Sequence, residues 1–209
     1  MNKKLKYFLG LCLTVFAAAG MARADTLYYL NQSAGGWSLP SSGYFGTVDL
    51  SQVGSNVNVT VNLSSGVEFV STGAGYALEF TVPSTTTASD ITNLTSGFTA
   101  GAGTGNSNAF GKFDMYSDCS SACGNGGSSP NPGPLSFTVD GVNISDFSAN
   151  GDGAYFASDV IDYNVSGKPT GLVGSDGPGT PVIPEPSSLL LLGTGLAALA
   201  GALKFKLFV

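Results

Sequence analysis

The sequence contains no histidine, and this absence removes several kinds of functional site. None of the 209 residues is His. Hydrolases with a Ser–His–Asp triad, zinc sites with imidazole ligands and histidine-based pH switches all need that side chain. Any function has to depend on carboxylates, amides, hydroxyls, aromatic rings or the three cysteines.

Basic side chains are scarce between residues 25 and 183. Of the eight Lys and Arg residues only Lys112 and Lys168 lie there, whereas every one of the fourteen acidic residues except Glu185 does. Binding of nucleic acids and of anionic lipids depends on Lys and Arg. We therefore expect an acidic domain with no nucleic-acid partner, suited to solubility, cation binding or a place in a matrix.

Residues 1–24 have the three parts of a secretory signal peptide. Three lysines precede the apolar run Leu9–Ala19, and a small-residue site with Ala22 and Ala24 follows. We expect this segment to be a helix that directs the chain to the secretion translocon, with cleavage after Ala24. A retained N-terminal anchor is the alternative, and the short apolar run argues against it.

Residues 25–165 are expected to form one all-β domain. Asn56–Leu63 alternates strictly between apolar and polar residues, the pattern of a strand with one face in a core and one in water. Seven or eight short strands separated by Gly, Ser and Asn predict an antiparallel β-sandwich or jelly-roll-like fold. The other runs are Thr26–Leu30, Gly46–Leu50, Val67–Val70, Tyr76–Val82, Phe110–Tyr116, Leu135–Val139 and Ala154–Tyr163.

Turn-forming residues place the connections between these strands. Asp140-Gly141 between apolar residues predicts a β-hairpin. Two Gly- and Ser-rich stretches, residues 96–109 and 117–134, are expected to be surface loops. Residues 166–183 are rich in Gly and Pro, which predicts a linker that contains one short edge segment, residues 170–174.

An apolar segment follows the linker. Residues 187–207 span about 31 Å as a helix, close to the thickness of the hydrocarbon core of a bilayer. Lys204 and Lys206 can extend to the lipid headgroups, on the side where basic residues are preferred. Pro184 and Pro186 disfavour helix in the residues before them. We predict a single C-terminal transmembrane helix behind an extended peptide.

The order of these features resembles the PEP-CTERM sorting signal, here residues 184–209. The resemblance implies recognition by an exosortase, a membrane-embedded cysteine protease or transpeptidase of Gram-negative bacteria, and a link to exopolysaccharide and biofilm. The family usually ends in an arginine-rich cluster, whereas this sequence has two lysines followed by Leu-Phe-Val. A plain tail anchor is the alternative. The residues that carry the resemblance are Pro184, Glu185, Pro186, Lys204 and Lys206.

Cys119 and Cys123 are expected to form a disulfide. In an oxidising compartment, two cysteines this close are more often bonded than metal-bound. A zinc site would need two further ligands, and without histidine only carboxylates remain. We expect reduction to leave activity unaffected and merely to loosen the loop of residues 117–134.

An acidic and amide-rich stretch offers oxygen ligands for calcium, at Asp146, Asn150 and Asp152. The spacing does not match an EF-hand loop. The alternative is that these residues are structural and that Asp159 and Asp162, further along, face water on a strand. No other cofactor is predicted.

Two further features suggest interaction with sugars. Glu68 and Glu79 are carboxylates in apolar strands, which a polysaccharide-active enzyme could use as an acid and base pair; outward-facing strand residues are the alternative. Trp37 could stack on a sugar ring, or it could anchor the core near the first strand.

The sequence therefore predicts an exported, surface- or matrix-associated, non-catalytic protein, sorted by an exosortase and linked to exopolysaccharide or biofilm. Its expected route runs through the inner membrane to the cell surface or matrix of a Gram-negative bacterium. The alternatives are a secreted carbohydrate-binding module and, after that, a polysaccharide-active enzyme.

Overall fold

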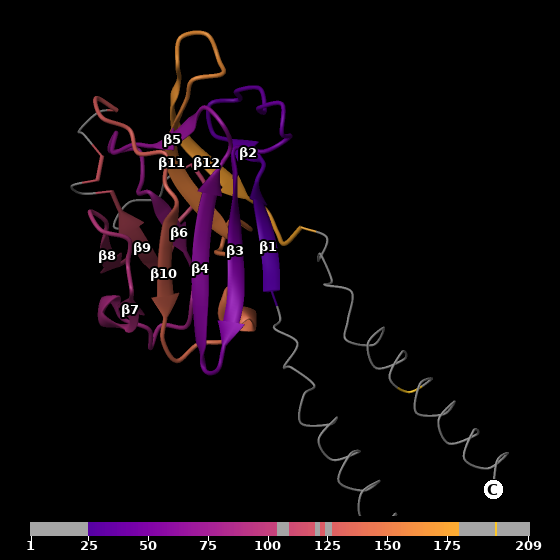
Figure 1. Ribbon diagram of the computed structural model, residues 1–209, viewed down its shortest axis with the longest axis vertical. Coiled ribbons are helices and arrows are strands. Elements are labelled where there is room, and N and C mark those ends of the chain that lie inside the picture. Colours follow the sequence, from indigo (N-terminus) through magenta and orange to yellow (C-terminus); the bar gives the residue numbers. More distant parts are fainter. Residues whose placement is uncertain (1–24, 104–108, 120–121, 124–126, 180–194, 196–209) are drawn as a thin grey trace, which may run out of the picture. The chain divides into compact units, whose positions relative to one another are not determined.

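The computed structural model describes residues 25–103, 109–119, 122–123, 127–179 and 195. Within these ranges the chain forms twelve strands and two 3-10 helices, η1 (Ala88–Asp90) and η2 (Ile144–Asp146). The strands make two antiparallel sheets that pack against each other (Figure 1). The prediction of an all-β, sandwich-like domain is confirmed.

Sheet A has five strands in the order β1-β3-β4-β10-β7. β3 and β4 form a tight hairpin in which Val53 pairs with Asn56. Gly54, the first residue of its turn, has a φ of 63°, and glycine adopts this left-handed region without strain. The strand bounds are β1 (Asp25–Leu30), β3 (Gly46–Val53), β4 (Asn56–Leu63), β7 (Ile91–Thr92) and β10 (Leu135–Val139).

Sheet B has the order β2-β12-β11-β6-β9-β8, and β5 pairs with β11 as well. Phe69 of β5 lies opposite Val160, and Phe80 of β6 lies opposite Phe156, so the chain between β5 and β6 leaves the sheet and returns to the same strand. The strand bounds are β2 (Gln32–Ser33), β5 (Val67–Phe69), β6 (Leu78–Phe80), β8 (Thr99–Ala102), β9 (Met115–Asp118), β11 (Phe156–Asp162) and β12 (Thr170–Ser175).

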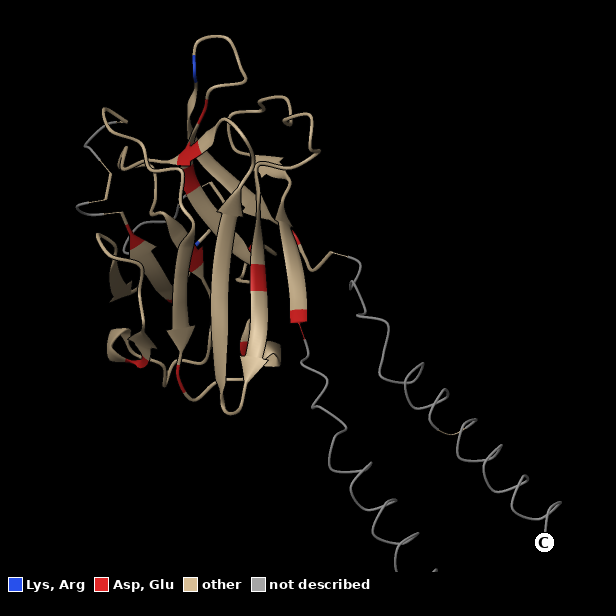
Figure 2. Ribbon diagram, in the orientation of Figure 1, with Lys and Arg blue, Asp and Glu red and all other residues tan. Residues whose placement is uncertain are grey.

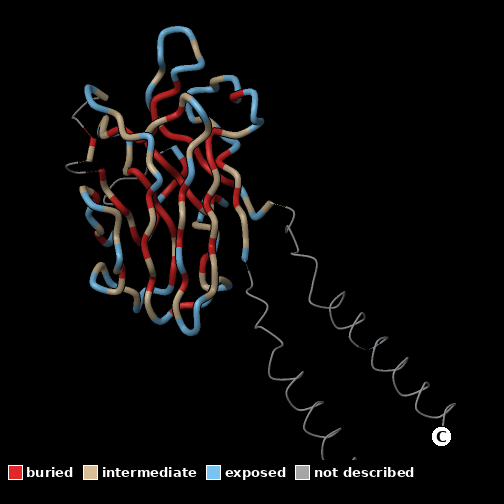
Figure 3. The backbone as a smooth tube through the Cα atoms, in the orientation of Figure 1, coloured by how far each residue is buried: buried red, intermediate tan, exposed pale blue. Residues whose placement is uncertain are grey.

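Aromatic side chains join the two sheets across the core. Phe80 of sheet B stacks on Phe137 of sheet A with ring centroids 5.6 Å apart. Tyr28 of sheet A meets the edge of Phe156 of sheet B at 4.8 Å. Buried positions alternate with more exposed ones along β4, as period-two patterning requires (Figure 3). Each buried aromatic of this kind contributes about 1.5–3 kcal/mol through burial.

The outer face of sheet B is covered as well. Phe110 and Phe113 pack there in a second apolar cluster with Ala154, Ala157 and Leu172. The strand predicted over Phe110–Tyr116 is therefore wrong in its placement: β9 begins at Met115, and the aromatic residues before it lie on the sheet. Their apolar character reflects this covering layer.

Three further sequence-based expectations differ from the structure. Asp140-Gly141 forms a turn into η2 and makes no hairpin, because β10 pairs with β4 and β7. Residues 170–174, expected as an edge segment of the linker, belong to β12, which pairs with β11 on one side and β2 on the other. The stretch 96–109, expected as a loop, contains β8. Pairing with distant strands explains part of these differences, since β10 pairs with β4 and β12 pairs with β2.

Candidate functional site

Several of the predicted sites lie outside the described residues. They are the signal cleavage residues Ala22 and Ala24, the tripeptide Pro184, Glu185 and Pro186, the basic residues Lys204 and Lys206, and the transmembrane helix expected over 187–207. Among the residues that are described, no helix has the length and apolar character needed to cross a membrane.

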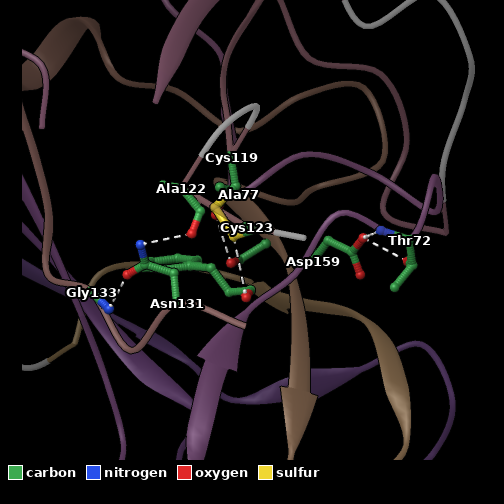
Figure 4. The surroundings of a disulfide bond; sticks show 10 residues. Thr72, Ala77, Cys119, Ala122, Cys123, Asn131, Gly133 and Asp159 are labelled. Carbon is green, nitrogen blue, oxygen red and sulfur yellow. Dashed lines mark hydrogen bonds between the residues drawn. A yellow bond between two sulfur atoms is a disulfide. The ribbon is translucent and has the colours of Figure 1, made fainter. Parts of the chain in front are cut away.

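The predicted disulfide between Cys119 and Cys123 is present, with a Cα–Cα distance of 5.3 Å. Its surroundings differ from the expected surface loop, because both cysteines are buried in the main core (Figure 4). The Cys123 sulfur lies 3.4 Å from the carbonyl oxygen of Phe69 in β5. The disulfide is therefore not confined to a surface loop, because it forms part of the packing between β5 and β9. The effect of reduction stays a prediction.

Asn131 holds the chain that follows the disulfide. Its backbone exchanges two hydrogen bonds with Phe69, at 2.8 and 3.0 Å. Its side-chain amide donates to the carbonyl of Ala122 at 3.2 Å and its side-chain oxygen accepts from the N–H of Gly133 at 2.8 Å (Figure 4). The disulfide and Asn131 thus fix the same end of sheet B.

Asp159 is fully buried in β11, where the sequence suggested a water-facing strand residue. Its Oδ2 accepts hydrogen bonds from the backbone N–H of Thr72 at 2.9 Å and from the Thr72 hydroxyl at 2.6 Å (Figure 4). Its Oδ1 is buried with no hydrogen-bond partner among the described residues. Burial, and to a lesser extent the charge of Asp118, raise the pKa of this carboxyl, while the bonds from Thr72 oppose the rise.

Asp162, also expected to face water, is buried at the end of the same strand. Its Oδ1 accepts a hydrogen bond from the backbone N–H of Asn164 at 2.8 Å. The role of this carboxylate is therefore to hold the turn after β11. Sequence reasoning missed both buried aspartates because the signal, a polar residue in an apolar strand, fits an outward residue equally well.

Glu68 and Glu79, considered as an acid and base pair, both lie on strands that pair with β11. Glu68 is partly exposed, whereas Glu79 is 1% exposed. They pair with Ile161 and Ala157, four residues apart, so their Cα atoms are separated by about 13 Å along the sheet. The two residues therefore lie at different heights along β11, and an acid and base pair formed by them stays a prediction.

The calcium candidates are engaged in local structure. Asp146 accepts a hydrogen bond from the N–H of Asn143 at 2.7 Å and caps η2. Asn150 accepts from the N–H groups of Asp152 and Ala154, both at 3.0 Å. The described part of the chain contains no group of three or more Cys, Asp or Glu residues able to hold a metal. Calcium binding stays a prediction, which thermal melts with calcium and with a chelator test.

Trp37 lies half-buried at the margin of the core. Its ring meets Phe45 edge-on, with centroids 6.0 Å apart. Its backbone N–H donates a hydrogen bond to the Ser33 hydroxyl at 3.3 Å. Gly171 approaches the ring closely from β12. This packing supports the anchoring interpretation and leaves part of the ring accessible.

The outer face of sheet A consists largely of short polar side chains. On β3, β4, β7 and β10 it carries short hydroxyl and amide side chains, with Asp49 as the one charged residue. At the margin, β1 adds Asp25, Leu27 and Tyr29, which pair with Ser51, Asp49 and Thr47. Figure 2 shows acidic residues on both β1 and β3. The whole sequence is 11% charged, so the low charge of this face matches that of the chain. We call the set on β3, β4, β7 and β10 the polar face. Its members are Thr47, Asp49, Ser51, Asn58, Thr60, Asn62, Thr92, Ser136 and Thr138.

Comparison with known proteins identifies the C-terminal segment. Residues 182–204 match the PEP-CTERM protein-sorting motif, and this confirms the resemblance based on Pro184-Glu185-Pro186. No curated protein and no solved structure matches the chain. The chain therefore carries a PEP-CTERM protein-sorting motif, which indicates an exported protein that is anchored transiently at the membrane and processed by an exosortase-type enzyme.

Proposed function

We propose that this protein is a non-catalytic component of the cell surface or extracellular matrix, linked to exopolysaccharide after sorting by an exosortase. The observation that carries the proposal is the sorting motif over residues 182–204. It follows an acidic all-β domain with only two lysines, Lys112 and Lys168, between residues 25 and 183. Such a domain stays soluble and is repelled by anionic membranes and nucleic acids.

The use of the acidic residues supports a non-catalytic role. Asp159 holds Thr72, Asp162 holds the turn at Asn164, and Asp146 caps η2. Asp90 likewise accepts a hydrogen bond from the N–H of Thr87 at 2.8 Å and caps η1. These carboxylates stabilise local structure, which is the ordinary function of capping residues. A turnover screen on polysaccharides with the full-length protein should release no sugar.

The sorting step is tested with three full-length proteins expressed in an exosortase-containing host. The first is the natural sequence, the second replaces Pro184, Glu185 and Pro186 with alanine, and the matched control replaces Ser187 and Ser188 with alanine. We expect intact mass to show C-terminal shortening of the natural and control proteins. The tripeptide variant should keep its full C-terminus and stay in the membrane fraction. Equal masses and equal fractions for all three would contradict the proposal.

The link to exopolysaccharide is tested separately on intact cells. Digestion of the matrix with polysaccharide hydrolases should move the processed protein from the cell-associated fraction to the supernatant. Treatment with heat-inactivated hydrolases is the control. A protein that stays with the cells after the matrix has been removed is not held by polysaccharide.

A further inference from the structure

We infer that the polar face of sheet A is a binding surface for a neutral polysaccharide, an inference that rests on the proposed function and assigns it a location. The face is built from three cross-strand rows. Ser51, Asn58, Thr138 and Thr92 form one row, Asp49, Thr60 and Ser136 form the next, and Thr47 and Asn62 form the third. Strands lie about 4.8 Å apart and rows about 6.8 Å apart, so the face is a regular array of hydrogen-bonding groups.

The side chains of the array are held in place by one another. The Thr138 hydroxyl donates to Asn58 Oδ1 at 3.0 Å, and the Asn93 amide donates to the Thr138 hydroxyl at 3.3 Å. The Ser51 hydroxyl donates to Asp25 Oδ1 at 2.7 Å at the margin. Short, mutually bonded side chains lose little conformational freedom when a ligand binds. The face is therefore preorganised to exchange hydrogen bonds with a polyhydroxylated chain.

Aromatic rings lie at one margin of the polar face. Tyr29 of β1 pairs with Thr47 of β3, and its ring lies against Tyr44 with centroids 5.0 Å apart. Both tyrosines are partly exposed. A tyrosine ring offers an apolar surface with a polar end, the combination that suits the C–H face and hydroxyls of a sugar. The margin thus adds stacking to the hydrogen bonds of the array.

The charge of the polar face distinguishes between anionic polymers, proteins and neutral polysaccharides as ligands. The face contains no Lys or Arg, and its carboxylates, Asp49 and Asp25 at the β1 margin, repel anions, so an anionic polymer has no counter-charge there. It also lacks the apolar and aromatic centre on which protein–protein interfaces depend. A neutral polysaccharide is complementary in both respects, because it needs hydroxyl and amide partners and no charge. The occupant we assign is therefore an uncharged polymer of sugars.

The experiment is co-sedimentation of the full-length protein, purified in detergent, with three insoluble neutral polysaccharides: cellulose, a β-1,3-glucan and chitin. We expect the natural protein to pellet with at least one of them, in 0.05 M and in 0.5 M salt alike, because no ion pair is involved. The double variant Asn58→Ala/Asn62→Ala should lose at least tenfold in apparent affinity. The matched control Ser84→Ala/Thr85→Ala, in an exposed turn that is not part of the polar face, should bind as the natural protein does.

A second variant, Asn58→Lys, tests the inference if the alanine substitutions weaken binding by destabilising the domain. It should bind the neutral polymer at least tenfold more weakly while its melting temperature stays within a few degrees of that of the natural protein. Failure to pellet with any of the three polymers, or equal binding by the face and control variants, would overturn the inference. Self-association of the natural protein that Asn58→Lys abolishes, without polymer binding, would assign the face to a second copy of the chain. None of these results depends on the sorting assay, so the two proposals fail independently.

Discussion

The carboxylate of Asp159 accepts both hydrogen bonds that Thr72 can donate, at 2.9 Å from the backbone N–H and 2.6 Å from the hydroxyl. The two residues are far apart in sequence, and the contact holds the segment between β5 and β6 at the point where it leaves sheet B. A buried carboxylate thus serves as the anchor of an irregular segment.

Removal of this anchor should destabilise the domain. We expect Asp159→Ala to lower the free energy of unfolding by about 2–4 kcal/mol, because it deletes charge-assisted bonds and leaves the Thr72 N–H without its partner. Thr72→Val, which keeps the shape and removes the hydroxyl, should lower it by about 1–2 kcal/mol. Urea denaturation measures both. The exposed Asp152→Ala is the matched control, with an expected change below about 0.5 kcal/mol. If Asp152→Ala lowered the free energy of unfolding as much as Asp159→Ala does, Asp159 would not be the anchor of this segment.

The same carboxyl should make stability depend on pH in a direction opposite to that of most acids. Burial raises the pKa of Asp159 above its ordinary value of 3.8, so the folded state holds this proton more tightly than the unfolded state does. Stability is therefore greatest below pH 3.8, falls as pH rises from there through the raised pKa, and is constant above it. Since other groups titrate too, the quantity to measure is the difference between natural protein and Asp159→Asn.

That difference is obtained from urea denaturation of both proteins between pH 4 and pH 7. Asparagine cannot ionise, so the natural protein should lose stability relative to Asp159→Asn as pH increases. Parallel pH profiles for the two proteins would show that the carboxyl titrates alike in the folded and unfolded states. A profile of the opposite slope would mean that the bonds from Thr72 outweigh burial.

The buried disulfide should contribute to the stability of the whole domain. Closure of so short a loop is worth about 2 kcal/mol in the unfolded chain. Because both cysteines lie in the core, we expect the loss of stability on reduction to appear in the global unfolding transition. Denaturation with and without a reductant measures the effect. The variant Cys119→Ala/Cys123→Ala is the control, since a reductant should leave it unchanged.

The sequence predicted most accurately those elements whose pattern is local. Asn56–Leu63 was expected as a strand with the bounds of β4, because period-two alternation defines a strand with one buried face. The disulfide was also predictable, since two cysteines four residues apart have few other uses in an exported chain. These features depend on neighbouring residues alone.

The remaining features depend on contacts between distant segments. β12 has a Gly-rich sequence, and it is a strand because β11 and β2 supply partners on both sides. The sequence pattern predicts that Asp159 faces water. It is buried because other segments cover the outer face of sheet B. A one-dimensional pattern cannot show whether the second face of a sheet is covered, so the buried aspartates could not be predicted. The polar face was overlooked because it becomes an array only when the strands are placed side by side.

The covering of sheet B gives the last prediction, at Gly174. A Cβ atom on Gly174 of β12 would lie 2.7 Å from the ring of Phe110, a distance at which the ring has to move. We expect Gly174→Ala to lower the free energy of unfolding by about 1–3 kcal/mol, as overpacking does elsewhere. Gly151→Ala is the matched control, because a Cβ there meets no atom within 4 Å and should be neutral or slightly stabilising. Urea denaturation of both variants distinguishes steric conflict from a general effect of alanine. Equal stability of the two variants would mean that Phe110 does not pack on β12 in solution, and that the outer face of sheet B is open.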